Sequence, residues 1–304
     1  MISYSIIIPH KNSSTTIIRL LDSIPENINY EIIIIDDNSE LHHKKSLSNI
    51  VRNQEFKLIF SNESIGAGAA RNIGLANATG KWLLFADSDD YYSKDIDTLL
   101  TNYKDSHADI IYFGCDSIDD KGNQSYRHER YMNLVSNYIK DSGKEDALRY
   151  LFTPPWSKMI RKDLVLKHNI LFDKVLASND IMFSLRLASC AKSILATNKI
   201  LYIITLTKGS IINTINKEYF NSKFLVALTA NNFLRSINKH QYQQSILYFL
   251  AMSYRYGFKY MFFIIYQLIK NRSNILIGMN KIFNITEVMK QRENKEYTIR
   301  RNEK

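Results

Sequence analysis

The chain has few cysteines and no long apolar run. Cys115 and Cys190 are the only cysteines among 304 residues, which excludes a disulfide framework and indicates a reducing compartment. The longest apolar run, at 261–269, is much shorter than the roughly 18 residues that a membrane-spanning helix needs. The N-terminus "MISYSIIIPHK" lacks a basic segment and a cleavage site, so it favours a strand over a signal peptide. We therefore expect a cytosolic globular protein.

Acidic residues are scarce in the last third of the chain. From Lys217 to Lys304 there are 15 Lys and Arg but 5 Asp and Glu, whereas residues 1–216 hold 25 of each kind. The whole formal charge of +10 therefore belongs to the C-terminal third. This asymmetry favours an anionic partner for that region, although a solvated basic surface would need no partner.

The first 115 residues alternate short, isoleucine-rich runs with stretches of helical length. The predicted strands cover 5–9, 31–36, 57–61, 81–86 and 109–114, and the predicted helices cover 15–24, 41–53, 67–78 and 94–106. Because the apolar runs are nearly continuous, they indicate strands that are buried on both faces. The pattern predicts an α/β fold with a mostly parallel sheet, in which ligands bind at the carboxyl ends of the strands.

Polar residues follow each of the first four predicted strands. They form four segments, Pro9-His10-Lys11-Asn12, Asp36-Asp37-Asn38-Ser39, Gly66 to Asn72, and Asp87-Ser88-Asp89-Asp90. One acidic loop alone is most often solvated surface. Four polar loops, two of them acidic, on one edge of a parallel sheet indicate a binding site for a polar ligand.

The glycine-rich segment does not predict a nicotinamide-dinucleotide site. Gly66 and Gly68 begin a G-x-G pattern, but Arg71 stands in place of the third glycine, and the segment follows the third strand rather than the first. Small residues still let a helix N-terminus approach a ligand, and Arg71 could bind a phosphate there. The alternative is an arginine paired with an acid.

Two acidic pairs are candidates for nucleotide and metal binding. One carboxylate of Asp36 and Asp37 can accept from a nucleobase or a ribose, while Asn38 tolerates a left-handed turn; the segment could also cap a helix. Asp87 and Asp89 have the D-x-D spacing, which can place two carboxylates on one Mg²⁺ or Mn²⁺ together with substrate phosphates.

The ordered segments "SIIIPHKN", "EIIIIDDNS", "GAGAARNIGL" and "GKWLLFADSDD" resemble those of the inverting family-2 glycosyltransferases of the GT-A fold. The resemblance continues through "PPWSKMIRKDL", "NILFD", "SNDIMFSLRL" and "YIITLTKGSI", and covers roughly residues 3 to 212. Several motifs in the family's order are much more specific than any one of them.

The resemblance implies a role for individual residues. Asp36 and Asp37 would hold the base and ribose, Arg71 would face the uracil and diphosphate, Asp87 and Asp89 would contact the ribose and metal, and Asp180 would be the catalytic base. The chain departs from the family at three positions: Lys11 often corresponds to a tyrosine, Asn38 to a glycine and Asn179 to a glutamate.

Asp180 also precedes an amphipathic helix, where an N-cap role is the alternative to a base. Trp156 offers a flat face for a sugar ring, although a tryptophan is more often part of the core. The further candidates for donor, acceptor or phosphate contacts are Pro9, Lys11, Ser88, Asp90, Trp156, Lys158, Asn179 and Lys208.

The segment Gln243–Arg272 mixes aromatic residues with Arg255 and Lys259, which lie four residues apart. With the local excess of positive charge, it predicts an interfacial helix on an anionic membrane. A packed helical bundle with a basic outer face is the alternative. Nucleic acid fits less well as a partner, because no nucleic-acid-binding module accompanies the basic surface.

The sequence thus predicts an inverting transferase that moves a hexose from a UDP-sugar to a saccharide or undecaprenyl-diphosphate-linked acceptor in the assembly of bacterial O-antigen or capsule. We expect it on the inner face of the cytoplasmic membrane. The predicted domains are a transferase domain at 1–212 and a basic helical region at 213–304. Within the first, residues 1–115 would bind the nucleotide-sugar and residues 116–212 the acceptor. A nucleotidyltransferase and an inactive sugar-binding protein are the alternatives.

Overall fold

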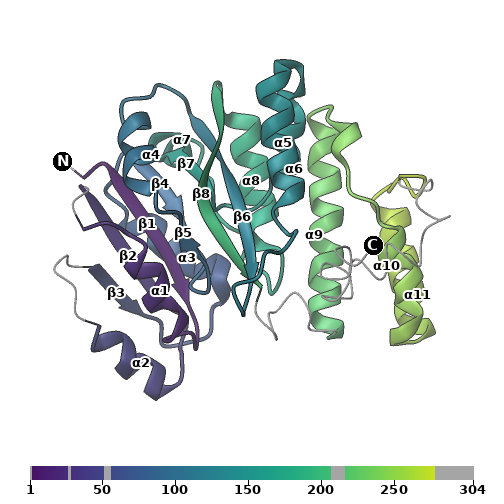
Figure 1. Cartoon of the computed structure of the whole chain (residues 1–304). Helices are drawn as coiled ribbons and strands as arrows, with labels where there is room; N and C mark the ends of the chain where they lie inside the picture. The colour runs from purple at the N-terminus through teal and green to yellow at the C-terminus, as the bar shows by residue number, and fades with distance from the viewer. Residues whose placement is uncertain (1, 27–28, 51–55, 207–215, 278–304) are drawn as a thin grey trace. The chain divides into compact units, whose positions relative to one another are not determined.

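The computed structural model describes residues 2–26, 29–50, 56–206 and 216–277 (Figure 1). The chain divides into two compact units. The first comprises Met1–Lys174 and Phe183–Thr207, and the second comprises Val175–Met182 and Lys208–Lys304. The expected domain boundary at residue 212 lies outside the described residues.

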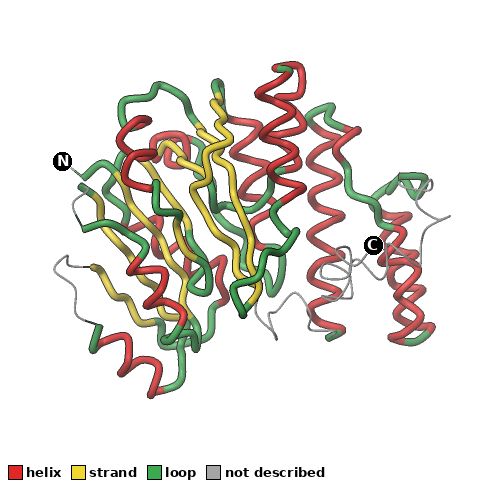
Figure 2. Tube along the Cα trace, viewed as in Figure 1, coloured by secondary structure: helices red, strands yellow, loops and turns green. Residues whose placement is uncertain are grey.

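The first unit is built around one mixed sheet (Figure 2). Its strands are β1 Tyr4–His10, β2 Tyr30–Asp36, β3 Phe56–Phe60, β4 Trp82–Phe85, β5 Tyr91–Tyr92, β6 Ile110–Asp119, β7 Lys158–Arg161 and β8 Ile194–Leu206. Within the described residues, their order is β3-β2-β1-β4-β7-β6-β8-β5. β1, β2, β3 and β4 are parallel, as are β6 and β8, whereas β7 and β5 are antiparallel to their neighbours. The predicted α/β fold with a mostly parallel sheet is confirmed.

Helices cover both faces of the sheet. They are α1 Thr16–Asp22, α2 Leu41–Ser48, α3 Gly66–Asn77, α4 Ile96–Tyr103, α5 Glu129–Lys140, α6 Glu145–Leu151, α7 Lys162–Lys167 and α8 Asn179–Cys190. A short 3₁₀ turn, Ser142–Lys144, leads into α6. α3 packs on β1 and β2, and α5 packs on β6 and β8.

The isoleucine-rich strands form the centre of the core. Every residue from Ile6 to Ile8 in β1 and from Ile32 to Ile35 in β2 is fully buried. Because consecutive strand residues point to opposite faces of a sheet, both faces must be covered by helices. The continuous apolar runs of the sequence have this origin.

The described part of the second unit contains three further helices, α9 Lys217–Ser236, α10 Leu247–Met252 and α11 Phe258–Lys270, with 3₁₀ turns at His240–Tyr242 and Ser253–Tyr256. Phe220 and Phe224 of α9, Phe249 of α10 and Ile264 of α11 belong to one apolar cluster. None of the described helices is long and apolar enough to cross a bilayer.

Gln243–Arg272 is not one continuous helix, and its contact with a membrane stays a prediction. The helical conformation is interrupted at Gly257, whose φ of 90° lies in the region that favours glycine. Arg255 therefore belongs to the 3₁₀ turn and Lys259 to α11, so their spacing of four residues does not place them on one helix.

Candidate active site

Strand register brings the first four strand ends to one edge of the sheet. His10 at the end of β1 lies opposite Asp36, and Asp36 lies opposite Phe60 at the end of β3. β4 ends at Phe85, which pairs with Ile7 of β1. The loops that follow these parallel strands therefore lie at one edge, where the sequence predicted a polar site.

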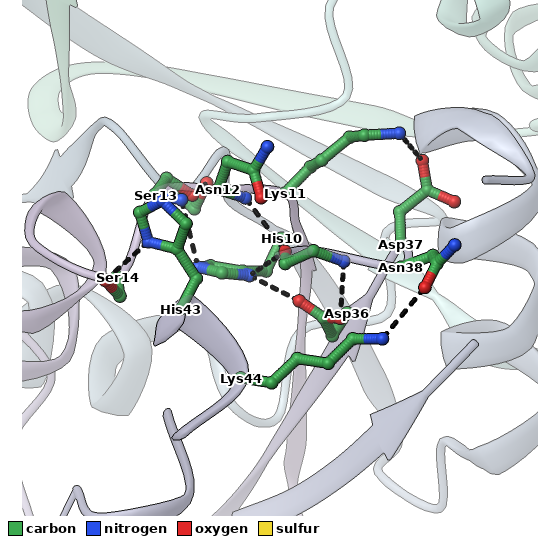
Figure 3. A network of polar contacts seen from close by, with 12 residues as sticks. His10, Lys11, Asn12, Ser13, Ser14, Asp36, Asp37, Asn38, His43 and Lys44 are labelled. Carbon is green, nitrogen blue, oxygen red and sulfur yellow. Dashed lines mark hydrogen bonds and ion pairs between the residues drawn. The ribbon is translucent and has the colours of Figure 1, made fainter. Parts of the chain in front are cut away.

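A buried histidine–aspartate pair joins the ends of β1 and β2 (Figure 3). His10 Nδ1 is 2.9 Å from Asp36 Oδ2, and both side chains are completely buried. The N–H of Ser13 donates to His10 Nε2 at 3.3 Å, so Nδ1 carries the proton and donates to Asp36. Burial lowers the pKa of His10. Burial acts to raise the pKa of Asp36, but hydrogen bonds from Ser39 and His10 bring it below its usual value.

Two asparagines in left-handed conformation shape the loops after β1 and β2. Asn12 has φ of 50° and Asn38 has φ of 54°, a conformation that asparagine tolerates better than most residues. The N–H of Asn12 donates to Ser39 Oγ at 2.8 Å, and its side-chain oxygen accepts from the N–H of Glu40 at 2.9 Å. These reciprocal bonds tie the two loops together.

Asp37 links β2 to the start of α3. Its Oδ1 accepts from the N–H of Ile65 at 2.5 Å and from that of Gly66 at 3.1 Å, where the helix dipole favours a negative charge. Lys11 Nζ lies 3.5 Å from Asp37 Oδ2 and donates to Ser64 Oγ at 2.7 Å. The Lys11 side chain is 46% exposed, so its ammonium group remains accessible at this edge.

The predicted contact of Asp36 with a nucleotide does not fit this structure. Its carboxylate is completely buried and bonded to His10 and Ser39, so it supports the loops from beneath. Asp37 is buried as well, with 6% of its side chain exposed and its carboxylate bonded to the N–H groups of Ile65 and Gly66, and its contact with the base or ribose stays a prediction. Pro9, another predicted donor contact, is buried within β1.

Arg71 of α3 reaches the loop after β4. Its Nη2 is 2.5 Å from Asp87 Oδ1, and its guanidinium carbon is 5.4 Å from the centroid of the Phe172 ring. The Arg71 side chain is 8% exposed, whereas that of Asp87 is 36% exposed. The ion pair holds Asp87 in a fixed orientation with part of its surface open. Arg71 thus pairs with an acidic residue, as the alternative interpretation of the sequence expected. Its contact with a phosphate stays a prediction.

The D-x-D segment forms a tight turn. The N–H of Asp90 donates to the carbonyl of Asp87 at 3.0 Å, and the N–H of Asp87 donates to the hydroxyl of Tyr202 at 2.8 Å. The hydroxyl oxygens of Ser88 and Ser13 are 2.7 Å apart. The turn is thus bonded both to β8 and to the loop after β1.

Arg19 of α1 holds the same turn from another side. It donates to the carbonyl of Asp89 at 2.6 Å and to Thr205 Oγ1 at 2.8 Å, and it lies over the ring of Tyr91. Arg19 and Tyr202 were not predicted to belong to the site. His10 stands within one of the four predicted polar segments, but no role was assigned to it.

The carboxylates of the turn repel one another. Burial and the charge of Asp87 raise the pKa of Asp89, and burial and the charges of Asp89 and Asp87 raise that of Asp90 well above its usual value. A cation would offset this repulsion. However, no three His, Cys, Asp or Glu side chains of the described chain form a ready-made metal site. Binding of a Mg²⁺ or Mn²⁺ ion by Asp87 and Asp89, with further ligands from substrate phosphates, stays a prediction.

Three residues that were predicted to contact the acceptor or a phosphate are buried in the structure. Trp156 is 4% exposed and stacks on Tyr202 with ring centroids 5.5 Å apart, so the core alternative applies and sugar stacking is excluded in this conformation. Lys158 is 3% exposed and donates to the carbonyl of Phe152 at 2.6 Å, which withdraws it from a phosphate. Asp90 is also buried and accepts from the N–H of Thr205 at 2.7 Å, so it braces the turn.

Asp180 belongs to the second unit and stands in the first turn of α8. The helix begins at Asn179, so Asp180 lies inside it rather than at the N-cap position of the alternative. The side chain is half-buried, and a helix N-terminus favours a negative charge. Its role as the catalytic base, like the acceptor contact of Asn179, stays a prediction. Lys208 lies outside the described residues.

The mixed sheet carries an acidic, arginine-bearing edge at the carboxyl ends of its parallel strands, which is where ligands bind in α/β folds. Residues 5–168 match Glycosyl transferase family 2, and the chain belongs to this family. The resemblance seen in the ordered motifs is thereby confirmed.

Two curated relatives show how far the similarity extends. The chain is 26% identical to the cholesterol galactosyltransferase of Borreliella burgdorferi over 227 residues, covering 70% of this chain and 62% of that protein. It is 24% identical to the poly(ribitol-phosphate) beta-N-acetylglucosaminyltransferase TarS of Staphylococcus aureus, covering 69% of this chain and 36% of TarS. The chain thus spans less than two thirds of the length of these relatives.

Solved structures support the fold. The chain superposes on S. aureus TarS 1–349 in complex with UDP-GlcNAc with a TM-score of 0.65 and 18% sequence identity, over 89% of this chain and 80% of that one. The same TarS fragment in complex with UDP gives a TM-score of 0.58 over 81% of this chain and 73% of that one. Both comparisons confirm the GT-A fold predicted from the sequence.

Proposed function

We propose that the protein is an inverting glycosyltransferase that moves a hexose from a UDP-sugar to a hydroxyl of a sugar acceptor. The main support is the partly exposed carboxylate of Asp87, oriented by Arg71 at the carboxyl edge of a family-2 sheet. Lys11, accessible at the same edge, adds positive charge for a diphosphate. The similar TarS fragment binds UDP-GlcNAc and UDP, which favours a uridine nucleotide as donor.

The donor site fits a metal-assisted departure of the diphosphate. Asp87 and Asp89 would hold a Mg²⁺ or Mn²⁺ ion, which when bound supplies charge compensation for the leaving UDP. Arg19 holds the carbonyl of Asp89, so the turn that carries both carboxylates keeps its shape as the ligand enters or leaves. Arg71 orients Asp87 and lies beside the expected position of the phosphates.

The acceptor side needs a base. We assign this role to Asp180, which would take the proton from the attacking hydroxyl. Attack on the anomeric carbon from the face opposite the diphosphate converts an α-linked donor into a β-linked product. The anionic form that a base requires is favoured by the position of Asp180 in the first turn of α8.

The acceptor would be a saccharide or an undecaprenyl-diphosphate-linked sugar, and the pathway would build a bacterial surface polysaccharide such as O-antigen or capsule. A lipid-linked acceptor requires the enzyme to work at a membrane. We therefore place it at the inner face of the cytoplasmic membrane as a peripheral protein. The excess of positive charge in the C-terminal third supports this location.

The test is transfer from a panel of UDP-hexoses and UDP-N-acetylhexosamines to a GlcNAc-diphosphate-lipid analogue in the presence of Mn²⁺. We expect one donor to yield a product of the added sugar mass, with a β-linkage by NMR. An α-linkage would contradict inversion. Release of pyrophosphate from a nucleoside triphosphate, without sugar transfer, would instead establish a nucleotidyltransferase. UDP-sugar binding without turnover on any acceptor would indicate an inactive binding protein.

A further inference from the structure

Helix α11 has two apolar faces. Tyr260, Ile264 and Leu268 lie on the inner face and are buried in the cluster with α9 and α10. The outer face, formed by four large side chains, is open to solvent. Phe258 is 75% exposed, Phe262 64%, Tyr266 59% and Ile269 72%.

The four exposed residues form one continuous stripe. They are spaced by four, four and three residues, which places them along one side of a helix. Packing inside the second unit explains the inner face but not the outer one. Within the described parts of the chain, Tyr254, Phe258, Phe262, Tyr266 and Phe60 are the exposed large aromatic residues, so all but Phe60 gather at α11 and the turn before it. An exposed stripe of this kind marks an interaction surface.

Positive charge surrounds the stripe. Lys259 and Lys270 of α11 and Arg272 just after it are exposed. Residues 217–277 contain eight Lys and Arg and a single acidic residue, Glu218, so ion pairs within this segment cannot neutralise the surface. An apolar stripe beside basic side chains matches an anionic bilayer, whose headgroups attract the cations while its acyl region takes up the aromatic rings.

A second copy of the chain is the other occupant to weigh. A symmetric dimer through α11 would bring two surfaces of the same positive sign together, and the repulsion would oppose association. An anionic lipid surface has the opposite charge. The charge of the segment therefore favours the membrane over self-association.

We propose that the outer face of α11, formed by Phe258, Phe262, Tyr266 and Ile269, inserts into the interfacial region of a membrane that contains anionic lipids. The helix has 13 residues, too few to span a bilayer, so it would lie in the plane of the interface. The inference deepens the peripheral location proposed above, because it names the surface that attaches. It does not depend on which sugar is transferred.

The test uses the full chain and vesicles of phosphatidylcholine with or without phosphatidylglycerol. The variant Phe262→Ala/Tyr266→Ala removes two rings from the stripe, and Lys259→Gln/Lys270→Gln removes two of its charges. The matched control is Ile139→Ala/Leu166→Ala, which truncates exposed apolar residues of the first unit. Co-sedimentation measures binding, thermal unfolding checks folding, and transfer to a water-soluble acceptor measures activity.

We expect the wild type and the control to bind anionic vesicles equally. The ring variant should bind at least about ten-fold more weakly, because burial of aromatic side chains in an apolar phase is strongly favourable. The charge variant should lose its preference for anionic over neutral vesicles. Transfer to the soluble acceptor should be unchanged in all variants.

Wild-type binding by a folded ring variant would overturn the proposal. Failure of the wild type to bind vesicles would also overturn it. If the wild type then formed a concentration-dependent dimer and Phe262→Ala/Tyr266→Ala did not, the stripe would be a dimer interface. If the wild type binds vesicles but transfers no sugar to any acceptor, the proposed function is rejected, while the proposed membrane contact of α11 stands.

Discussion

The carboxylates of Asp87 and Asp89 are two residues apart but have different surroundings. Arg71 pairs with Asp87, whereas the side chain of Asp89 has its pKa raised by burial and by the charge of Asp87. Of the two, Asp89 is therefore the carboxylate that a divalent cation would stabilise more. Arg71 orients the carboxylate of Asp87, whereas a metal ion would compensate the negative charge of Asp89.

Replacement of Asp89 by alanine should remove metal-dependent UDP binding and reduce transfer by at least about 100-fold, because one of two protein ligands is lost. Isothermal titration of UDP with and without Mn²⁺ measures the first effect, independently of activity. Asp97→Ala, an acid of α4, is the control and should behave as the wild type. Full activity of the wild type in excess EDTA would reject the metal.

Replacement of Asp180 by asparagine tests the catalytic base. The change keeps the shape of the side chain but removes the proton acceptor, so transfer should fall by about 10²–10⁴-fold. UDP affinity should not change, because Asp180 is assigned to the acceptor. Since Asp180 lies inside the first turn of α8, a purely structural role forecasts a small loss of helix stability and normal turnover. Turnover, UDP affinity and melting temperature together decide the question.

His10 gives the protein a pH-dependent stability. Burial lowers its pKa from the usual 6.5, with the charge of Asp36 acting to raise it and that of His43 to lower it. The unfolded chain therefore binds a proton at a higher pH than the native state does, and stability should fall as pH decreases through about 6.5 until native His10 is itself protonated.

The variant His10→Asn keeps an N–H donor for Asp36 but cannot titrate. Urea unfolding at pH 7.5 and at pH 5.5 should show a smaller loss of stability for this variant than for the wild type. His240→Asn, at an exposed position, should keep the wild-type pH dependence. An unchanged pH dependence in His10→Asn would show that the buried pair does not titrate as inferred.

At the scale of elements, the site depends on how closely the loops and strands approach one another. Gly80 precedes β4, and a Cβ atom there would lie 2.6 Å from the carbonyl carbon of Tyr4 and 2.7 Å from the amide nitrogen of Ser5. The backbone of β1 cannot yield as a side chain can. Gly80 therefore allows β4 to start against β1, and β4 carries the D-x-D turn at its other end.

We expect Gly80→Ala to lower the free energy of unfolding by about 1–3 kcal/mol, the usual cost of an overpacked contact. Thermal and urea unfolding measure the change. Ala76→Ser, which adds one atom at an exposed position of α3, is the control and should be near neutral. A melting temperature of Gly80→Ala equal to that of the wild type would contradict this account of the strand packing.

At the scale of the whole molecule, the net positive charge is concentrated in one segment of the chain. The formal charge of +10 lies in the last third, while residues 1–216 are balanced. The N-terminal segment can therefore bind an anionic donor only through local cations such as Arg71 and Lys11, because its overall charge gives no attraction. The C-terminal segment, which holds the excess of positive charge, would attract an anionic membrane at longer range, as the proposed location requires.

Binding of the full chain to anionic vesicles should weaken several-fold as salt rises from about 50 mM to about 500 mM, because surface charges are screened over a Debye length of about 8 Å at physiological ionic strength. A residual, salt-resistant fraction should remain through the apolar face of α11. Co-sedimentation across a salt series measures both contributions. If the protein bound neutral and anionic vesicles equally at every salt concentration, the apolar face alone would account for binding, and the electrostatic contribution would be rejected.

The sequence by itself determined the α/β class, the strand order along the chain and the four polar loops at one sheet edge. These features depend on local patterns: continuous buried runs such as Ile32–Ile35, and polar residues directly after them. The order of motifs was enough to identify the family.

Only the tertiary structure decided which polar side chains are open. Asp36, Asp90, Trp156 and Lys158 all stand in suggestive motifs, yet each is buried by residues that are distant in sequence or belong to another loop. Arg19 supports the D-x-D turn from 70 residues away and was not predicted. Side-chain burial depends on contacts between elements, and residue spacing carries no information about them. The break at Gly257 and the exposed stripe of α11 were decided in the same way, by the packing of one helix face against its neighbours.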